Sequence, residues 1–328
     1  MDRRRPRAQE LGFAAALLLT AGALAQAGDR PLRAERWLAP GTDIARTLSR
    51  EPAECLRLPD EPDRRLSVEV GRAAFRAPTV LGGQAARAGL ACESCHRAGR
   101  ANPEFAFPGV SGPPGTADVT SSLFSTHRGD GVFNPRPIPD LGGPKTGLRI
   151  DQAPQAKALE PFIRGLVTQE FDGAEPPAAV LQGLADYVRA LSPDACPRGS
   201  DAPVSLAGLM ADARRAAQAA EALDARGDRP SAVVMVQAAR ARLFFVDERY
   251  ADPTLAADRD RLRAADGALA AIAQALRDGT PDAARRLARW RSDSRRLEAA
   301  LARHQARSLF DSRRLAAATD GGLPRRPS

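Results

Sequence analysis

Apolar positions recur at helical spacing through the C-terminal part of the chain. Between residues 201 and 316, Ala and Leu alternate with Arg and Asp. One set of apolar residues falls three, four or seven positions apart and marks a buried helix face: Leu262, Leu269, Ile272 and Leu276. The pattern predicts four helices, over residues 204–225, 230–246, 254–278 and 280–310.

Short turns rich in Gly, Pro and Asp separate these predicted helices. The last helix is expected to have Thr280 as its N-cap and Pro281 at its first position. Because short turns join antiparallel neighbours, a four-helix bundle is predicted over residues 201–316. A disordered tail is expected over 317–328.

Residues 28–200 show a different pattern, with shorter helical stretches between proline-rich segments. Helices are predicted over 66–75, 159–171 and 177–191. A segment rich in Pro and Gly fills residues 101–147, and loops of this length inside a domain are usually functional or ordered around a ligand. With 328 residues and only 5% aromatic residues, the chain is expected to be all-α and to form two domains, split near residue 200.

The N-terminus has the pattern of an export signal over residues 1–27. Basic residues come first, an apolar run over 11–24 follows, and Ala25-Gln26-Ala27 offers small residues for cleavage. The apolar run is shorter than the roughly 20 residues that span a bilayer, so cleavage is favoured over an uncleaved anchor. We therefore expect a periplasmic protein without a transmembrane span.

Charge is unevenly distributed along the chain. Residues 28–200 hold equal numbers of basic and acidic residues, whereas residues 201–328 hold 23 Arg and 17 acidic residues. This excess would suit an acidic redox partner or a membrane surface. The alternative, a solvated helix surface on which both signs alternate, is favoured. Nucleic acid is not an expected partner, since aromatic and basic residues do not interleave.

Two of the four cysteines lie in a haem-attachment pattern. Cys92-Glu93-Ser94-Cys95-His96 places two thiols three residues apart, at the spacing that reaches both vinyl groups of one haem, followed by an imidazole for the iron. A redox dithiol is the first alternative, but no βαβ unit is evident. A zinc site would need a second Cys/His pair. One covalently bound haem c is therefore predicted, with His96 as the axial iron ligand.

The other two cysteines, Cys55 and Cys196, lie near the two ends of the same region. In an oxidising compartment they are expected to form a disulfide that closes residues 28–200. Two free thiols are the alternative.

The sixth iron ligand is less clearly indicated. Residues 28–200 contain no Met, and Met210 and Met235 occupy apolar helical positions that suit core packing. His127 is the other His of this region and is the candidate ligand, with a loop position as its alternative. His304 lies among polar residues and is expected at the surface. Two arginines, Arg128 and Arg136, are weak candidates for binding the haem propionates.

Three stretches of residues 65–195 carry a family resemblance: Val70-Gly71-Arg72-Ala73-Ala74-Phe75 before the attachment motif, the motif itself, and Asn134-Pro135-Arg136-Pro137-Ile138-Pro139-Asp140-Leu141 after it. This region resembles the bacterial di-haem cytochrome c peroxidase superfamily, which includes the methylamine-utilisation-type enzymes. Members carry two attachment motifs, whereas this chain has one. The resemblance implies a single-haem domain of cytochrome c-like fold.

Three functions follow as hypotheses. One-electron transfer by a periplasmic monohaem cytochrome is favoured. A peroxidase-like oxidoreductase with an open or labile sixth iron site is the second hypothesis, and a haem-based sensor or interaction protein is the third. Whether the chain is an enzyme is left open.

Overall fold

A computed structural model describes residues 32–120, 123–125, 127, 130–145, 148–197 and 201–320. The chain is mostly helical in these ranges, as the all-α prediction required. The predicted export signal and Arg128 lie outside them. The strands are short and form two antiparallel pairs, β1 (Arg50–Pro52) with β4 (Asp201–Pro203) and β2 (Thr116–Ala117) with β3 (Arg136–Pro137).

The N-terminal helices are short, apart from two of 13 and 14 residues. They are α1 (Ile44–Ser49), α2 (Pro62–Phe75), α3 (Pro78–Leu81), α4 (Gly83–Arg87), α5 (Cys92–Cys95), α6 (Leu159–Gly165) and α7 (Ala178–Ala190). A π-helical turn, Leu166–Glu170, continues α6. The 3₁₀ turns are Arg33–Trp37, Arg97–Gly99, Pro154–Ala156, Pro193–Ala195, Pro253–Leu255 and Gln305–Arg307.

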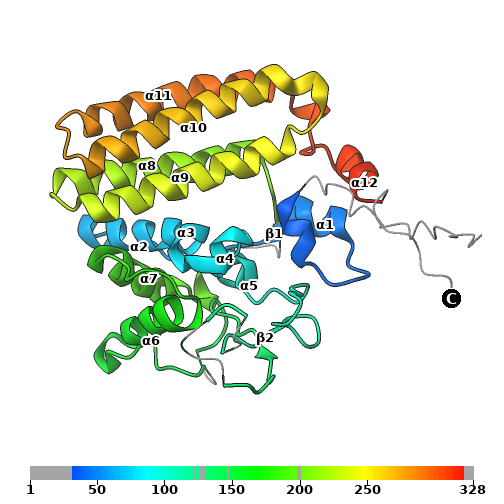
Figure 1. The fold of residues 1–328 in the computed structure, drawn as a ribbon, viewed down its shortest axis with the longest axis vertical. Helices are drawn as coiled ribbons and strands as arrows, with labels where there is room; N and C mark the ends of the chain where they lie inside the picture. The colour runs from blue at the N-terminus through cyan, green and yellow to red at the C-terminus, as the bar shows by residue number, and fades with distance from the viewer. Residues whose placement is uncertain are drawn as a thin grey trace, which may run out of the picture.

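The C-terminal helices are longer and are followed by a short one. They are α8 (Leu206–Ala225), α9 (Arg229–Arg249), α10 (Ala256–Arg277), α11 (Ala283–Ala302) and α12 (Ser312–Asp320). In Figure 1, α8 to α11 lie alongside one another at the top, with α2 to α4 beneath them and α7 and α6 lower still. Helix α8 contacts α9 and α11, and α10 contacts the same two helices, so the four form a closed ring.

Local hydrogen bonds explain where these helices begin and end. The Ser205 hydroxyl accepts from the Gly208 N–H at the start of α8, and the Asp228 carboxylate accepts from the Ser231 N–H at the start of α9. Helix α8 ends at Ala225, and Gly227 follows the C-cap with a φ of 79°, a conformation that suits glycine. The predicted bounds of the first three helices are therefore close to the observed ones.

The predicted bounds of the fourth helix were wrong at both ends. The Thr280 N–H donates to the Ala275 carbonyl at 2.9 Å, beside a left-handed Gly279, so Thr280 belongs to the C-terminal cap of α10. Helix α11 begins at Ala283 and ends at Ala302. The chain then turns into α12, which packs on α1 and extends to Asp320, so residues 317–320 of the predicted tail are helical. Residues 321–328 lie outside the described residues.

Helix α2 packs against other helices on two sides. On one side it crosses α7 where two glycines meet, Gly71 and Gly183; a Cβ on Gly71 would lie 1.8 Å from the Gly183 carbonyl oxygen. On the other side it contacts α8 and α9. The apolar core therefore continues from α2 and α7 into the C-terminal helices. The predicted division of the chain into two domains near residue 200 stays a prediction.

Cys55 and Cys196 form a disulfide, as the sequence predicted. The bond lies beside two backbone contacts that join the same parts of the chain: the Ser192 N–H donates to the Cys55 carbonyl at 2.8 Å, and Leu56 forms a bridge with Leu191. The β1–β4 pair continues this junction. The two ends of the region before the C-terminal helices are thus held together covalently and by hydrogen bonds.

Replacing Gly71 with Ala should destabilise the protein, because the added methyl group would overlap the backbone of α7. We expect a loss of about 1–3 kcal/mol or more in the free energy of unfolding, measured by urea denaturation. Gly267→Ala is the matched control: this exposed position in α10 has nothing within 4 Å of an added Cβ, so this change should stabilise by about 0.5–1 kcal/mol. Equal effects of the two changes would contradict the close crossing.

Replacing both Cys55 and Cys196 with Ser should lower the free energy of unfolding by up to about 5 kcal/mol, since the disulfide closes a loop across 141 positions. Urea denaturation of the oxidised proteins measures the difference. Dithiothreitol should bring the wild-type protein down to the stability of the variant and leave the variant unchanged. A variant as stable as the oxidised wild type would rule out a stabilising role of this bond.

Candidate functional site

The predicted attachment motif forms a single helical turn, α5, that is capped by its own residues. The Ser94 hydroxyl accepts from the Ala91 N–H at 3.0 Å, and the His96 N–H donates to the Cys92 carbonyl at 2.9 Å. These bonds fix the turn that places Cys92 and Cys95 one helical turn apart. Both cysteines are free, half-buried and packed against the apolar core.

Backbone and side-chain contacts from Asn102 hold the end of this turn. Its N–H donates to the Cys95 carbonyl at 3.0 Å, and its side-chain amide donates to the Ser94 carbonyl at 2.8 Å. The left-handed conformation of Ala98, with a φ of 50°, lets the chain reverse between these residues. The motif is therefore held by the segment that follows it in the sequence.

His96 is oriented by a backbone carbonyl of the proline-rich segment. Its Nδ1 atom lies 3.0 Å from the carbonyl oxygen of Pro139. When Nδ1 carries the proton and donates it to this oxygen, the lone pair is on Nε2, the atom that a metal would bind. Burial lowers the pKa of His96 to about 4, so the imidazole is neutral at pH 7. The Phe75 ring lies 6.3 Å from the imidazole, centroid to centroid.

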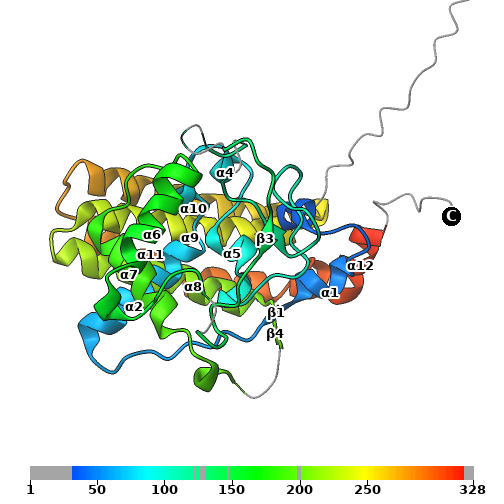
Figure 2. The ribbon, with the colours of Figure 1, turned by 90° about the horizontal axis from the view of Figure 1, so that it is seen from below.

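The segment that carries Pro139 is fixed on both of its sides. The Ile138 N–H donates to the Gly115 carbonyl at 3.0 Å, next to the β2–β3 pair. After Pro139, the Asp140 carboxylate accepts from the Arg100 Nε at 2.7 and 2.8 Å. The loops that carry β3 thus lie beside α5, as Figure 2 shows. In the residues that the structure describes, the proline-rich segment that the sequence predicted as a long loop contacts the attachment turn through Pro139.

A row of aromatic rings fills the interior of this long loop. Trp37 stacks on Phe107 at 4.1 Å between centroids, Phe107 contacts Phe124 at 5.0 Å, and Phe124 contacts Phe171 at 5.5 Å. The loop is therefore packed by its own apolar side chains, with an N-terminal Trp and a Phe from beyond α6.

Glu93, the residue after the first attachment cysteine, takes part in a buried network of charges. Its two carboxylate oxygens accept from Arg76 Nε at 2.9 Å and from Arg242 Nη2 at 2.7 Å. Arg76 comes from the end of α2 and Arg242 from α9. Burial opposes the charged form of Glu93, but the two guanidinium groups outweigh it and hold the pKa of the carboxyl below its ordinary value.

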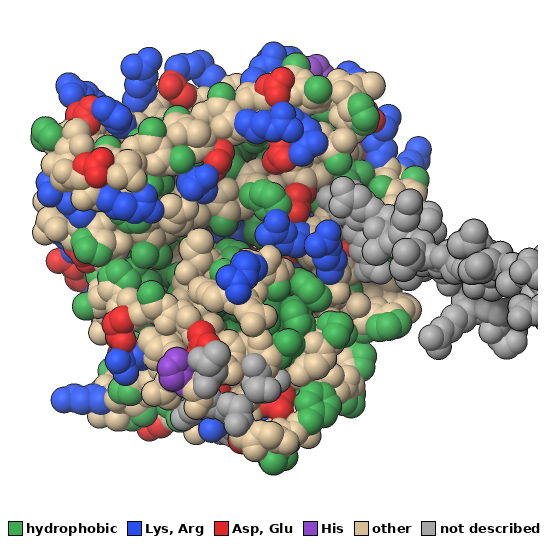
Figure 3. Space-filling view, viewed as in Figure 1, with side chains coloured by type: hydrophobic (Ala, Val, Ile, Leu, Met, Phe, Trp, Pro, Cys, Tyr) green, Lys and Arg blue, Asp and Glu red, His purple; other side chains and the backbone are tan. Residues whose placement is uncertain are grey.

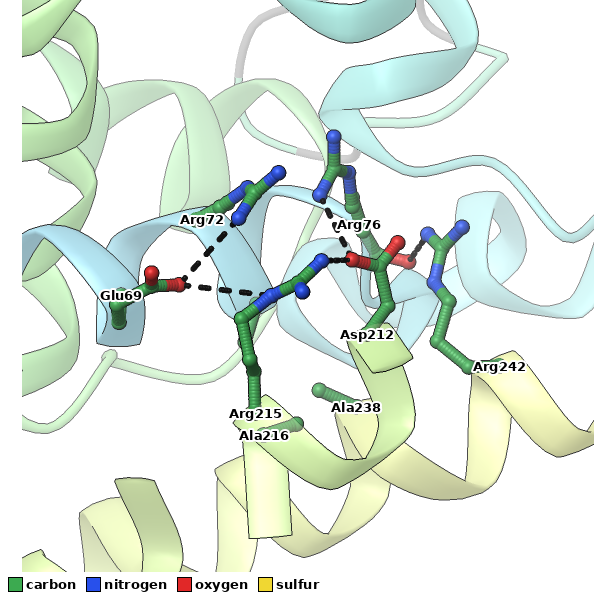
Figure 4. A pocket seen from close by; sticks show the side chains of 9 residues that line it. Glu69, Arg72, Arg76, Asp212, Arg215, Ala216, Ala238 and Arg242 are labelled. Atoms are coloured by element: carbon green, nitrogen blue, oxygen red, sulfur yellow. Dashed lines mark hydrogen bonds and ion pairs between the residues drawn. The ribbon is translucent and has the colours of Figure 1, made fainter. Parts of the chain in front are cut away.

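The same network extends to other helices. Arg76 also contacts Glu54 at 3.0 Å and Asp212 at 3.5 Å, and the Tyr187 hydroxyl of α7 donates to Glu54 at 2.7 Å. Figure 4 shows Asp212 between the guanidinium groups that approach it. We call this set, Glu54, Arg72, Arg76, Glu93, Tyr187, Asp212 and Arg242, the charge network.

Patterns in the sequence did not predict the charge network, although one signal was present. Met235, Ala239 and Val246 are buried on the core face of α9, and Arg242 has the same helical spacing with only 7% of its surface exposed. A charged residue at a core position is buried only when it is paired. Its partner, Glu93, lies 149 positions away in the sequence, and no pattern around Glu93 indicated a buried charge.

The candidate sixth ligand, His127, lies on an exposed loop. Its Nδ1 atom is 2.8 Å from the Asp172 carboxylate, and 65% of its side chain is exposed. The two methionines are fully buried in α8 and α9, which agrees with core packing. His304 was predicted at the surface but is partly covered, because its Nδ1 bonds the buried Asp258 at 2.7 Å.

Of the two arginines proposed for propionates, one is in the described part. Arg136 lies in β3 with its side chain exposed, and Arg128 lies outside the described residues. On the C-terminal helices, many arginines pair with carboxylates, as in Arg240–Asp266 and Arg291–Glu221, both at 2.7 Å. Figure 3 shows blue and red side chains intermixed over this part of the surface, while apolar side chains gather lower on the same face.

None of the helices that the structure describes is long and apolar enough to cross a membrane. Among the same residues, no group of three His, Cys, Asp or Glu side chains is arranged to hold a metal ion. No family model, curated protein or solved structure matches the chain.

The two free thiols should be unreactive in the folded chain before any group is attached. Burial raises the pKa of Cys92 and of Cys95 to about 12, so the thiolate that reacts with alkylating agents is scarce at pH 8. We expect iodoacetamide to modify them about 100-fold or more slowly in the folded chain than in urea, as measured by mass spectrometry. Equal rates in both conditions would show that the thiols are exposed.

Proposed function

We propose that the chain is an exported c-type cytochrome that carries one haem and transfers single electrons in the periplasm. The Cys92 and Cys95 thiols would each add across one vinyl group of the haem, forming a C–S bond while the thiol proton passes to the vinyl group. His96 would bind the iron through Nε2. When bound, haem c supplies an iron that changes its oxidation state by one electron.

One observation carries this proposal: the hydrogen bond between His96 Nδ1 and the Pro139 carbonyl. Histidines that bind metals nearly always donate their other ring N–H to a carbonyl or carboxylate, which fixes the tautomer and the orientation of the ring. Here that contact is made by the residue directly after two free cysteines at the attachment spacing. A simple dithiol does not require an oriented imidazole at this position, and a zinc site would need further Cys, His or carboxylate ligands that the described residues do not bring together.

The surroundings of the motif also support a single-haem domain of cytochrome c-like fold. Helices α2 and α7 cross closely, and Phe75 and Tyr187 pack 5.1 Å apart, centroid to centroid, on the side of the motif where His96 contacts Phe75. The chain offers two thiols, one neutral imidazole and apolar side chains, the donor set that haem c needs. We further propose that the C-terminal helices form a four-helix bundle packed on this domain.

A peroxidase-like activity is the second candidate, favoured by the exposed position of His127, because 65% of its side chain is accessible to solvent. Met210 and Met235 are buried in the core, which leaves His127 as the candidate sixth ligand. Its imidazole contacts the Asp172 carboxylate on an exposed loop. If His127 binds the iron, the site is closed and suits electron transfer. If it does not, the sixth position is left open for small molecules.

Covalent attachment is tested by expressing the full chain in a bacterial host that matures c-type cytochromes. The wild-type protein should carry the added mass of one haem and stay red after denaturing electrophoresis. Changing both Cys92 and Cys95 to Ser should abolish the added mass. Changing both Cys55 and Cys196 to Ser removes the same number of sulfur atoms and should keep it. A wild-type chain without added mass would refute the proposal.

The choice between the two candidate functions depends on the spectrum of the haem protein. Low-spin spectra and no carbon monoxide adduct of the ferrous form support electron transfer, whereas a high-spin component and an adduct support the peroxidase-like candidate. His127→Ala should convert the first behaviour into the second if His127 is the sixth ligand. An unchanged spectrum removes His127 as a ligand.

A further inference from the structure

We propose that Arg242 and Arg76 position the haem-attachment turn through Glu93, and that the charges of these three residues tune the reduction potential of the iron. This inference rests on the proposed function and gives the C-terminal helices a role in it. Arg242 and Arg76 are positioning residues, since neither belongs to the attachment motif itself.

Glu93 lies within the attachment motif, between its two cysteines. Glu93 follows Cys92 directly, so contacts that fix its carboxylate also fix the helical turn that carries both thiols and leads into His96. The carboxylate is fixed at both oxygens, by Arg76 at 2.9 Å and by Arg242 at 2.7 Å. The turn is therefore tied at the same time to α2 and to α9.

Arg242 also links α9 directly to the end of α2. Its Nη2 atom donates to the Arg76 carbonyl at 3.0 Å, just past the end of α2, in addition to its bond with Glu93. Both guanidinium side chains are only 8% exposed. Such groups hold one arrangement, because any movement would leave a buried donor or charge without a partner.

The charges of Arg76, Glu93 and Arg242 would also act on the bound iron through space. Charge interactions weaken with distance and with solvent screening, so charges shielded from water act over longer distances than exposed ones. A positive charge near the iron disfavours its ferric form and raises the reduction potential, and a negative charge lowers it. Removing Arg242 should therefore lower the potential, and removing the charge of Glu93 should raise it.

The experiment compares reduction potentials of the haem-loaded full chain, measured by spectroscopic redox titration. Arg242→Gln should shift the potential down, Glu93→Gln should shift it up, and the double variant should lie between the two. Arg240→Gln is the control: it removes an arginine from the same helix, but one that pairs with Asp266 at 2.7 Å and lies at a more exposed position. It should leave the potential unchanged.

The outcomes separate this inference from the proposed function. If the wild-type chain carries no covalent haem, the proposed function fails. If haem is attached and the two single variants leave the potential unchanged or shift it in the same direction, the inference is wrong, because general loosening of the site does not depend on the sign of the charge. If Arg242→Gln does not fold, Arg242→Lys takes its place: it should lower the thermal stability and keep the potential close to wild type. A large shift with the charge retained would overturn the electrostatic argument.

Discussion

Helix α2 has to fit closely against neighbours on two opposite sides, and much of the structure follows from this constraint. Toward α7 it presents Gly71, where the two backbones approach too closely for any side chain. Toward α8 and α9 it presents Arg72 and Arg76, whose charges are met by carboxylates from several elements. The contact with α7 depends on close backbone packing and has no room for an added side chain. The contact with α8 and α9 depends on paired charges, and the loss of one partner would leave the other charge buried and unpaired.

Buried ion pairs of this kind add little net stability when they are intact, but they are costly to break. Removing ions from water costs several kcal/mol for each ion, and the attraction between partners roughly offsets that cost. Losing one partner, however, typically costs about 3–5 kcal/mol, because the other charge is left buried and unpaired. We infer that the charge network favours this placement of the C-terminal helices on α2, because a placement that separates these charges would leave them buried and unpaired. The same network includes Glu93, so the arrangement that fixes these helices also fixes the attachment turn.

The attachment turn is in this way held from two directions. The carboxylate of Glu93 is bound by guanidinium groups from α2 and α9, and the imidazole of His96 contacts a carbonyl of the proline-rich segment. Neither contact involves the sulfur atom of Cys92 or Cys95, and both thiols are free of disulfides. In the proposed cytochrome, a turn held in this way would need less reorganisation when the haem is attached.

Local patterns in the sequence predicted part of this arrangement, and long-range contacts account for the rest. Helical spacing and turn residues predicted α8, α9 and α10. The Cys55–Cys196 disulfide was predicted because an exported protein meets an oxidising compartment. Thr280 was misplaced because the same residue suits either the end of one helix or the start of the next, and the backbone hydrogen bond to Ala275 decides between them. The partner of Glu93 could not be predicted, since only the packing of α9 on α2 brings Arg242 to it.

At position 76, an arginine makes contacts that a lysine could not make. Lys145 and Lys157 are the only lysines of the sequence. At Arg76, three different nitrogens face three different carboxylates: Nε faces Glu93, Nη2 faces Glu54 and Nη1 faces Asp212. A lysine ammonium is a single point of charge and does not reach three separated carboxylates in one plane. An Arg76→Lys change would keep the charge but could not keep all three pairings, so the planar fork matters here as well as the charge.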